Sequence, residues 1–392
     1  MRSLAPRLER LVESSTLAMS RRAATLKAAG VDVSPLAAGE PALDTPAHVI
    51  DAMIDAARAG ATRYPPVLGL PALRQAVADK HTHRYRVPIP AARIAVTPGA
   101  KFALWAAFQA ILRPGDEVLL PSPSWVSYAP QIELADGVVV PVPCRPEEGW
   151  RLDLTDLEAR LTPRTTAIVL CSPNNPTGIC LTEDAASRLA ELALSRDLWL
   201  VCDDLYAELV FGERPFISPL TARTELLDRT VLVDGLSKSH AMTGWRLGYL
   251  DAPPPLIELV GRLLGQTLTG TTTFVQHGAL AALLTPYDLR PIRDAYAERA
   301  SRLSAALRNI GLPTIAPEGG FCLMTDIRQR LAANDSADSL ALRLLDEAHV
   351  ATVAGEAFGA PGFLRLSFAC SDSALDLAIA RLTDFFGRLP GA

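Results

Sequence analysis

Short apolar runs alternate with helix-like segments along the chain after residue 93, and this alternation limits the possible folds more than any other feature. The runs cover residues 93–96, 117–120, 138–142, 167–171, 199–203, 230–234 and 245–250, and helical composition fills 100–112, 127–134 and 183–196. Several runs are continuously apolar, as in strands that are buried on both faces of a sheet. Strands that alternate with helices form parallel sheets. The sequence therefore predicts an α/β fold with a mostly parallel central sheet flanked by helices.

The length and the order of the segments predict more than one domain. The 392 residues are enough for about two to three domains of ordinary size. Residues 1–46 are expected to form an N-terminal arm, helical over 4–29 and extended over 31–46, that packs on a neighbour. Residues 47–285 would form the large domain that contains the sheet. Residues 286–392 would form a smaller α+β domain, which the arm completes.

Charge, hydropathy and cysteine spacing exclude several classes of function. The 38 Lys and Arg residues are outnumbered by 43 Asp and Glu without a basic block, so no nucleic-acid partner is expected. No apolar run approaches the roughly 18 to 20 residues that a membrane helix needs. The first residues lack the apolar core of a secretory signal, so we expect a cytoplasmic protein with no membrane partner. The six cysteines and six histidines show no metal-ligand spacing, which predicts reduced thiols and no metal site.

Lysine is scarce in this chain, since only four of the 38 basic residues are lysines: Lys27, Lys80, Lys101 and Lys238. A lysine retained in an arginine-rich chain is more often needed for amine chemistry, which a guanidinium cannot perform. Lys238 lies in a loop of small residues, 234–248, which follows a predicted strand and also contains Arg246. Near another cation and shielded from water, a lysine amine can form a Schiff base with a carbonyl. The alternative is a surface loop with two solvated cations.

Two carboxylates, Asp203 and Asp204, follow the apolar residues 199–201. They lie at the carboxyl end of a predicted strand, where α/β sheets bind their ligands. A carboxylate at this position fits a protonated pyridine nitrogen, whose charge it would maintain. Tyr206 is near enough in the sequence to offer its phenol to the same ring. The alternative is that one of the two aspartates caps the following helix.

Three other predicted strand ends also carry ligand-binding groups. Asn175 lies in the turn 172–178, and its amide can donate to a phenolate oxygen, although a turn-forming asparagine is the alternative. At residues 97–101 a strand end leads into a helix, so the backbone N–H groups of Gly99, Ala100 and Lys101 would face an anion such as phosphate. Trp125 follows the next strand and could stack on an aromatic ring, although a packed core tryptophan is the more frequent case.

Together these segments resemble the class I aminotransferases, enzymes of fold type I that use pyridoxal 5'-phosphate (PLP). The resemblance covers nearly the whole chain and is closest to the bacterial branch that contains aspartate and arginine:pyruvate aminotransferases. Residues 235–248 match the lysine-site pattern of that family at every position. The resemblance implies catalytic roles for Lys238, as the Schiff-base lysine, for Asp203, as the partner of the pyridine nitrogen, and for Tyr206. It also implies cofactor contacts from Asn175 and Tyr206 to the ring oxygen, from Trp125 to the ring face, and from Gly99, Ala100, Lys101 and Arg246 to the phosphate.

Two further matches implied by this resemblance concern the substrate and a second subunit. Residues 63–69 match the family segment whose tyrosine reaches the phosphate across a dimer interface, so Tyr64 is expected to complete the partner's site in a homodimer. Arg365, in the segment 363–369, corresponds to the arginine that binds the α-carboxylate of the substrate, for which its fork is suited. Gly39, in the matching segment 36–41, is expected near the same carboxylate. Asn175 is expected to contact the substrate as well.

The implied reaction moves an α-amino group from an L-amino acid to a 2-oxo acid by a ping-pong mechanism, with Lys238 as the general base. Glu356, in the loop 354–359, could face a cationic side chain, so we expect a basic or broad donor such as arginine. An exposed loop glutamate is the alternative. PLP-dependent amino-acid oxidases and β-lyases share these residues and are the alternative reactions. A regulatory protein or a nicotinamide dehydrogenase fits less well, because the chain has no room for a DNA-binding module and no Gly-x-Gly-x-x-Gly run.

Overall fold

The computed structural model describes residues 6–9, 11, 13, 15–332 and 335–389. Residues 1–5, on which the expectation of no secretory signal partly rests, lie outside these ranges. The sequence predicts one helix over 4–29 in the arm, but the described part of the arm contains two helices, α1 (Pro6–Glu9) and α2 (Ser15–Ala28). Between α2 and α3 (Ala47–Arg58) the chain is irregular, with turns at 29–30 and 36–37 and an isolated β-bridge at Ser34, so the predicted extended segment over 31–46 is only partly extended.

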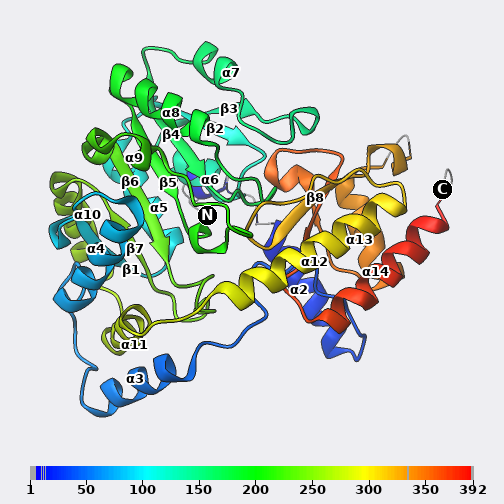
Figure 1. The fold of residues 1–392 in the computed structure, drawn as a ribbon, viewed down its shortest axis with the longest axis horizontal. Helices are drawn as coiled ribbons and strands as arrows, with labels where there is room; N and C mark the ends of the chain where they lie inside the picture. The colour runs from blue at the N-terminus through cyan, green and yellow to red at the C-terminus, as the bar shows by residue number, and fades with distance from the viewer. Residues whose placement is uncertain (1–5, 10, 12, 14, 333–334, 390–392) are drawn as a thin grey trace, which may run out of the picture.

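A seven-stranded sheet forms the centre of the large part of the molecule (Figure 1). Its order is β1-β7-β6-β5-β4-β2-β3, with bounds β1 (Ile94–Thr97), β2 (Glu117–Ser122), β3 (Val138–Pro143), β4 (Thr165–Cys171), β5 (Trp199–Asp203), β6 (Thr230–Gly235) and β7 (Gly248–Asp251). β7 runs antiparallel to both of its neighbours, β1 and β6, and the other neighbouring strands pair in parallel. The predicted mostly parallel α/β sheet is confirmed. The strand predicted over 245–250 begins only at Gly248, because Arg246 has a φ of 50°, which a strand does not accommodate.

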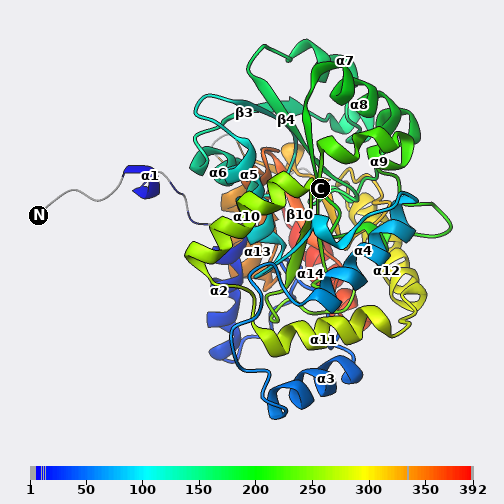
Figure 2. The ribbon, with the colours of Figure 1, turned by 90° about the vertical axis from the view of Figure 1, so that its left-hand side faces the viewer.

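Helices cover both faces of this sheet, because neighbouring residues of each strand point to opposite sides. On one face, Val231 and Val233 of β6 join a core with α5 (Ala100–Ile111), α6 (Tyr128–Leu134) and α10 (Pro254–Thr267). On the other face, Leu232 joins a core with α3, α4 (Pro71–Tyr85), α7 (Leu154–Ala159), α8 (Glu183–Arg196), α9 (Pro219–Ala222) and α11 (Thr273–Leu284). Figure 2 shows the same elements from the side. The strands read as continuous apolar runs because both of their faces are buried.

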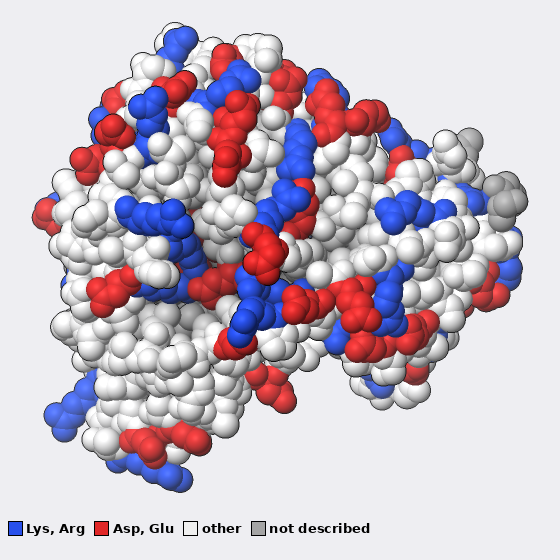
Figure 3. Space-filling view, viewed as in Figure 1, with Lys and Arg blue, Asp and Glu red and all other residues white. Residues whose placement is uncertain are grey.

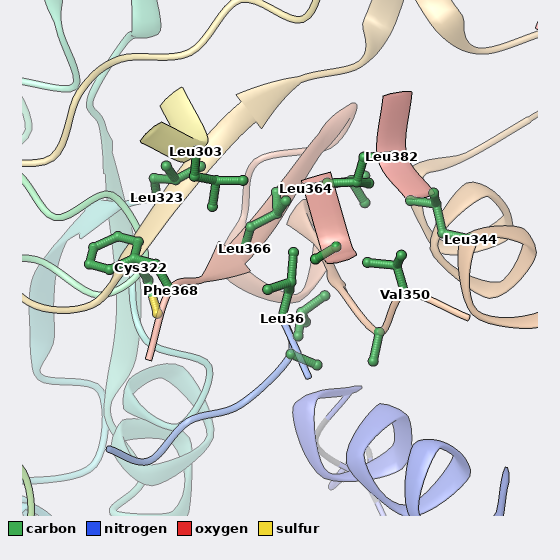
Figure 4. Close-up of a cluster of buried hydrophobic side chains, with 14 of the residues drawn as sticks. Leu36, Leu303, Cys322, Leu323, Leu344, Val350, Leu364, Leu366, Phe368 and Leu382 are labelled. Carbon is green, nitrogen blue, oxygen red and sulfur yellow. The ribbon is translucent and has the colours of Figure 1, made fainter. Parts of the chain in front are cut away.

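A second sheet lies beside the first and is built from the C-terminal part of the chain (Figure 1). Its antiparallel order is β8-β10-β9, with bounds β8 (Cys322–Asp326), β9 (Val353–Ala354) and β10 (Phe363–Ser367), and it packs with α12 (Arg290–Asn309), α13 (Ala337–Ala348) and α14 (Asp372–Gly387). Leu36 of the arm lies in the same core, among Leu364 and Leu366 (Figure 4). The arm therefore belongs structurally to this smaller layer, and the domain boundaries at 46 and 285 stay a prediction.

Charged groups are distributed without large blocks of one sign over the face of the molecule shown in Figure 3, where acidic and basic side chains are interspersed. None of the described helices is both long enough and apolar enough to cross a membrane. Within the described ranges, no three His, Cys, Asp or Glu side chains are grouped so that they could hold a metal ion.

Candidate active site

A cavity of about 580 Å³ opens where the carboxyl ends of the large sheet's strands face the smaller sheet. It takes residues from both layers and from the arm, which are far apart in the sequence. Most of the predicted site residues line it: Gly39, Ala100, Lys101, Trp125, Asn175, Asp203, Tyr206, Lys238, Arg246 and Arg365. Two do not: Gly99 lies directly behind Arg246, and Tyr64 is 85% exposed on the surface.

Asp203, the last residue of β5, is the carboxylate that faces the cavity. It follows Val201 on the α5 and α6 side of the sheet, and its Oδ2 accepts a hydrogen bond from the Tyr128 hydroxyl at 2.7 Å. Its Oδ1 accepts a second from the Leu205 N–H at 3.3 Å. Burial raises the pKa of Asp203 to about 6, against the opposing effect of these hydrogen bonds. A protonated ring nitrogen placed here would stabilise the charged carboxylate. Neither aspartate caps an α-helix, since a short 3-10 turn, Ala207–Leu209, follows.

Lys238 extends from the loop after β6 into the same cavity. Its Nζ donates a hydrogen bond to the carbonyl oxygen of Gly39 and lies 5.6 Å from the centroid of the Phe321 ring. Among the described residues it forms no ion pair with a carboxylate. Burial lowers the pKa of Lys238 to about 8. The amine is therefore neutral, and nucleophilic, in a much larger fraction of molecules at neutral pH than an ordinary lysine amine.

The two segments predicted to hold a phosphate meet where α5 begins, beside the end of the lysine loop. Gly99 precedes the helix with a φ of 92°, so the backbone N–H groups of the first turn are directed outward. The Arg246 guanidinium lies against Gly99 and donates to the Thr243 carbonyl at 2.8 Å. A Cβ on Gly248 would lie 2.3 Å from the Ala100 nitrogen, so the two segments are in close backbone contact. Unpaired N–H groups of a helix and a guanidinium that lie close together can bind a dianion such as a phosphate group.

We expect the substitution Gly99→Ala to weaken binding of PLP by the apoprotein at least about tenfold, because it perturbs both elements of the seat. The new Cβ would lie 2.8 Å from Arg246 Nη2, and the positive φ disfavours any side chain. Titration of the apoprotein with PLP measures the effect. Gly265→Ala is the matched control, since Gly265 lies inside α10 and its new Cβ would lie 4.0 Å from the nearest atom. Equal affinities for the two variants would contradict this account of the seat.

Arg365, in the middle of β10, is a buried cation without a counter-ion among the described residues. Its side chain is 2% exposed, Nη2 donates to the Ala37 carbonyl at 3.0 Å, and Nη1 donates to Oδ1 of Asn175 at 3.4 Å. The guanidinium lies over the Phe358 ring, and Nε has no hydrogen-bond partner in the described part of the chain. A buried charge without a partner is unfavourable, so this group is suited to bind a carboxylate. Asn175 directs its oxygen toward Arg365, which leaves its NH₂ group as the donor for a ligand oxygen.

Two aromatic side chains form further parts of the cavity wall. Tyr206 is buried, with its ring 5.4 Å from that of Phe321, and burial raises the pKa of its phenol well above the ordinary value. It therefore stays protonated and can donate a hydrogen bond. Trp125 packs edge-on against Tyr128 with ring centroids 5.2 Å apart, and the Lys101 ammonium lies 5.0 Å from the indole centroid. Trp125 is thus both packed and exposed to the cavity.

Three of the four lysines line this one cavity, and sequence reasoning identified only two of them. Lys27, from α2, joins Lys101 and Lys238 in the wall, and the fourth, Lys80, lies half-buried on the other face of the sheet. The scarcity of lysine in the sequence was the one indication of functional positions for Lys27 and Lys80. Tyr128, which holds Asp203, was missed because nothing in its local sequence distinguishes it from a core tyrosine.

Glu356 does not occupy the position that the sequence suggested. Its Oε1 accepts a hydrogen bond from the backbone N–H of Ala337, at 3.0 Å, at the first residue of α13. A carboxylate at a helix N-terminus is stabilised by the unpaired N–H groups there. Glu356 is also absent from the residues that line the cavity. The hypothesis that it faces a cationic substrate is therefore wrong.

The fold and this site together define a class of enzyme that binds an anionic, aromatic aldehyde cofactor through a lysine. The family model for aminotransferase class I and II matches residues 31–382, and the chain belongs to this family. It is accordingly an aminotransferase that depends on PLP, which confirms the class, the cofactor and the reaction implied by the sequence.

Proteins with high similarity include several aspartate aminotransferases. The probable aspartate/prephenate aminotransferase of Aquifex aeolicus is 40% identical over 385 residues, which are 97% of this chain and 98% of that protein. The aspartate aminotransferase of Geobacillus stearothermophilus is 38% identical over 386 residues, with the same coverage. Among solved structures, the aspartate aminotransferase of Thermus thermophilus with maleate has a TM-score of 0.93 and 38% identity, and the match covers 98% of this chain and all of that one.

Proposed function

We propose that this aminotransferase takes an amino donor with an acidic side chain, such as aspartate. The observation that carries the proposal is the charge of the cavity wall, to which Lys101 and Lys27 contribute ammonium groups in addition to the guanidinium of Arg365. The acidic wall residue Glu40 accepts a hydrogen bond from the Thr243 hydroxyl at 2.8 Å. The names of the relatives, aspartate, aspartate/prephenate and asparagine–oxo-acid aminotransferases, support the same direction. The expectation of an arginine donor rested on Glu356, which lies elsewhere.

PLP fits the site because its phosphate, ring nitrogen and aldehyde each meet a matching group. When bound, it supplies an electron sink for negative charge at the substrate Cα. Asp203 would hold a proton at the ring nitrogen, and Tyr206 and Asn175 would donate to the ring oxygen. Ala100 and Lys101, through backbone N–H groups, and Arg246 would hold the phosphate, and Trp125 would contact the ring face. The predicted contact from the Gly99 N–H is not available, because this group donates to the Thr97 carbonyl at 2.7 Å.

The chain's own residues then orient the substrate and move its proton. Arg365 binds the α-carboxylate, with the Gly39 backbone beside it, so that the Cα–H bond is directed toward Lys238. Lys238 Nζ, whose pKa is lowered by burial, would serve as the base that accepts the Cα proton and as the acid that gives it back. Because the same site takes the amino acid and then the 2-oxo acid, ping-pong kinetics are expected.

We also propose that the protein works as a homodimer with shared sites in the cytoplasm. Tyr64 supports the dimer, because a tyrosine that is 85% exposed makes few contacts within its own chain. Residues 63–69, which contain Tyr64, match the family segment whose tyrosine contacts the phosphate bound by the neighbouring subunit. In the dimer, the Tyr64 hydroxyl would donate to the phosphate bound by the partner.

Donor specificity tests the proposed function. With a common 2-oxo acid acceptor, kcat/KM for aspartate is expected to exceed that for arginine at least about tenfold, because Lys101 attracts the side-chain carboxylate and repels a guanidinium. Lys101→Met should lower kcat/KM for aspartate about tenfold or more while changing that for alanine less than about threefold. Alanine is the internal control, since it has no distal carboxylate. An equal or higher value for arginine would overturn the acidic-donor proposal.

A further inference from the structure

A buried ionic cluster lies on the face of the large sheet opposite the cavity. Its centre is Asp234 of β6, which is 2% exposed. Asp234 Oδ2 accepts a hydrogen bond from Arg84 Nη1 at 2.8 Å and lies 3.4 Å from Lys80 Nζ. The Tyr249 hydroxyl and His81 Nε2 approach the same oxygen at 3.3 and 3.6 Å. Four groups, three of them from the last turns of α4, thus surround one carboxylate oxygen.

This cluster is attached directly to the strand ends that carry Lys238 and Asp203. Asp234 precedes Lys238 by four residues, and its Oδ1 accepts the Gly235 N–H at 2.6 Å, where the lysine loop begins. On the next strand, the Asp204 N–H donates to the Val233 carbonyl at 2.9 Å. The Asp204 carboxylate accepts a hydrogen bond from the Tyr85 hydroxyl of α4 at 2.6 Å.

The alternation of side chains along the strands explains why the cluster and the site lie back to back. Asp203 points with Val201 toward α6 and the cavity, whereas Asp204 follows Cys202 toward α4. Asp234 likewise follows Leu232 toward α4. A displacement of either outer carboxylate therefore moves backbone that also places a cavity residue.

We propose that the end of α4, through Lys80, Arg84 and Tyr85, is a positioning unit that holds Asp234 and Asp204 and thereby places Lys238 and Asp203 for catalysis. None of these three α4 residues is among those that line the cavity. The inference rests on the roles proposed above for Lys238 and Asp203. The retention of Lys80, one of only four lysines, in this cluster supports it.

The charges of the cluster are balanced by close pairs. Glu208 lies 2.9 Å from Lys80 Nζ and 2.7 Å from Arg84 Nη2, so two carboxylates share two cations. Burial alone would raise the pKa of Asp234, but Lys80 and Arg84 hold it well below the ordinary value. His81 lies between Asp234 and Asp251; burial acts to lower its pKa, and the two carboxylates raise it. Burial raises the pKa of Asp204 to about 7, against the Tyr85 hydrogen bond and Arg84. Loss of one member leaves a buried charge unpaired behind the catalytic lysine.

The test compares two substitutions that remove opposite charges from one pair, Arg84→Met and Asp234→Asn. Arg74→Met is the matched control, because Arg74 is a partly buried arginine of the same helix whose hydrogen bonds, within the described residues, go to the carbonyls of Ile94 and Ala91. Two readouts are independent of turnover: the dissociation constant of PLP from the apoprotein, and the pH midpoint of the visible absorption band of the PLP-loaded protein. Thermal unfolding of each apoprotein reports whether the variants fold.

Both cluster variants are expected to raise the PLP dissociation constant about tenfold, and Arg74→Met less than about twofold. The pH midpoint should rise in Arg84→Met, which leaves net negative charge behind the strand end that leads to Lys238, and fall in Asp234→Asn, which leaves net positive charge there. Shifts of the same sign, or values equal to the Arg74→Met control, would overturn the proposal.

A second pair of variants, at Lys80, tests the proposal if Arg84→Met does not fold. If Arg84→Met does not accumulate as folded protein, Lys80→Met removes a cation from the same carboxylate, and Lys80→Arg, which keeps the charge, should restore the PLP affinity. An unchanged affinity in Lys80→Met would then overturn the positioning role. If the unmodified apoprotein develops no visible band with PLP, the proposed role of Lys238 fails first, and that outcome is distinct from failure of the cluster alone.

Discussion

Replacement of Lys238 by alanine is expected to lower kcat/KM by about 10⁴-fold or more and to abolish the visible absorption band that PLP gives with the protein. The physical reason is that one amine serves both as the covalent anchor and as the general base, and each role carries a large share of the rate enhancement. Its neutral form is accessible near neutral pH, since burial lowers its pKa to about 8. Steady-state kinetics and an absorption spectrum of the reconstituted variant check the two effects separately.

Lys238→Arg is the sharper control for this prediction. It keeps a cation in the loop, and only the amine chemistry is lost, because a guanidinium stays protonated and does not form the Schiff base. We expect the arginine variant to be as inactive as the alanine variant. Activity above about one per cent in either variant would show that another group moves the Cα proton. Lys101, whose ammonium also faces the cavity, would then be the next residue to replace.

Replacement of Arg365 by methionine is expected to lower kcat/KM for amino acids by about 10² to 10³-fold and, at the same time, not to lower the unfolding temperature of the apoprotein. The activity loss follows because the substrate carboxylate loses a buried, hydrogen-bonded cation, a change that costs about 2 to 5 kcal/mol. The stability is retained because Arg365 is 2% exposed and has no carboxylate partner in the described part of the chain. Removing a buried charge that lacks a counter-ion relieves a desolvation penalty.

The contrast between the two measurements makes this prediction specific. A residue needed only for packing would lose stability and activity together when replaced. Arg365→Lys should retain part of the activity, since it keeps the charge but not the two-pronged geometry. A fall in the unfolding temperature of Arg365→Met comparable to that of a core truncation would contradict the binding role. So would an unchanged KM for the amino acid.

Much of this fold was predictable because the relevant signals are local. A strand buried on both faces must be apolar at nearly every position, so the runs before Asp203 and Gly235 are visible without any knowledge of their neighbours. Parallel strands also place their carboxyl ends at one edge, so the sequence alone predicts that Asp203, Asn175 and Lys238 lie close together. The boundaries were less predictable, as at β7, where the left-handed backbone of Arg246 delays the strand.

The parts that escaped prediction depend on contacts between distant segments. From the sequence, Glu356 looks like an exposed residue of a loop. Its carboxylate reaches the Ala337 N–H because α13 packs against that loop in the folded chain. The groups at the end of α4 resemble a solvated helix end. They become a buried cluster because Asp234 and Asp204 lie on the strand faces that α4 covers.

The sequence by itself determined the class of fold, the family and the chemistry of the Lys238 loop, because periodicity, turn residues and a continuous motif are properties of neighbouring residues. The residue types alone left open which of two adjacent aspartates faces the cavity, although the family resemblance pointed to Asp203. The tertiary structure placed Asp203 on the cavity side, since a shift of one residue along a strand reverses the face. It also decided the pairing of Arg365 with Asn175, which are 190 residues apart. Such contacts depend on how two sheets and an arm pack together, and no local pattern specifies them.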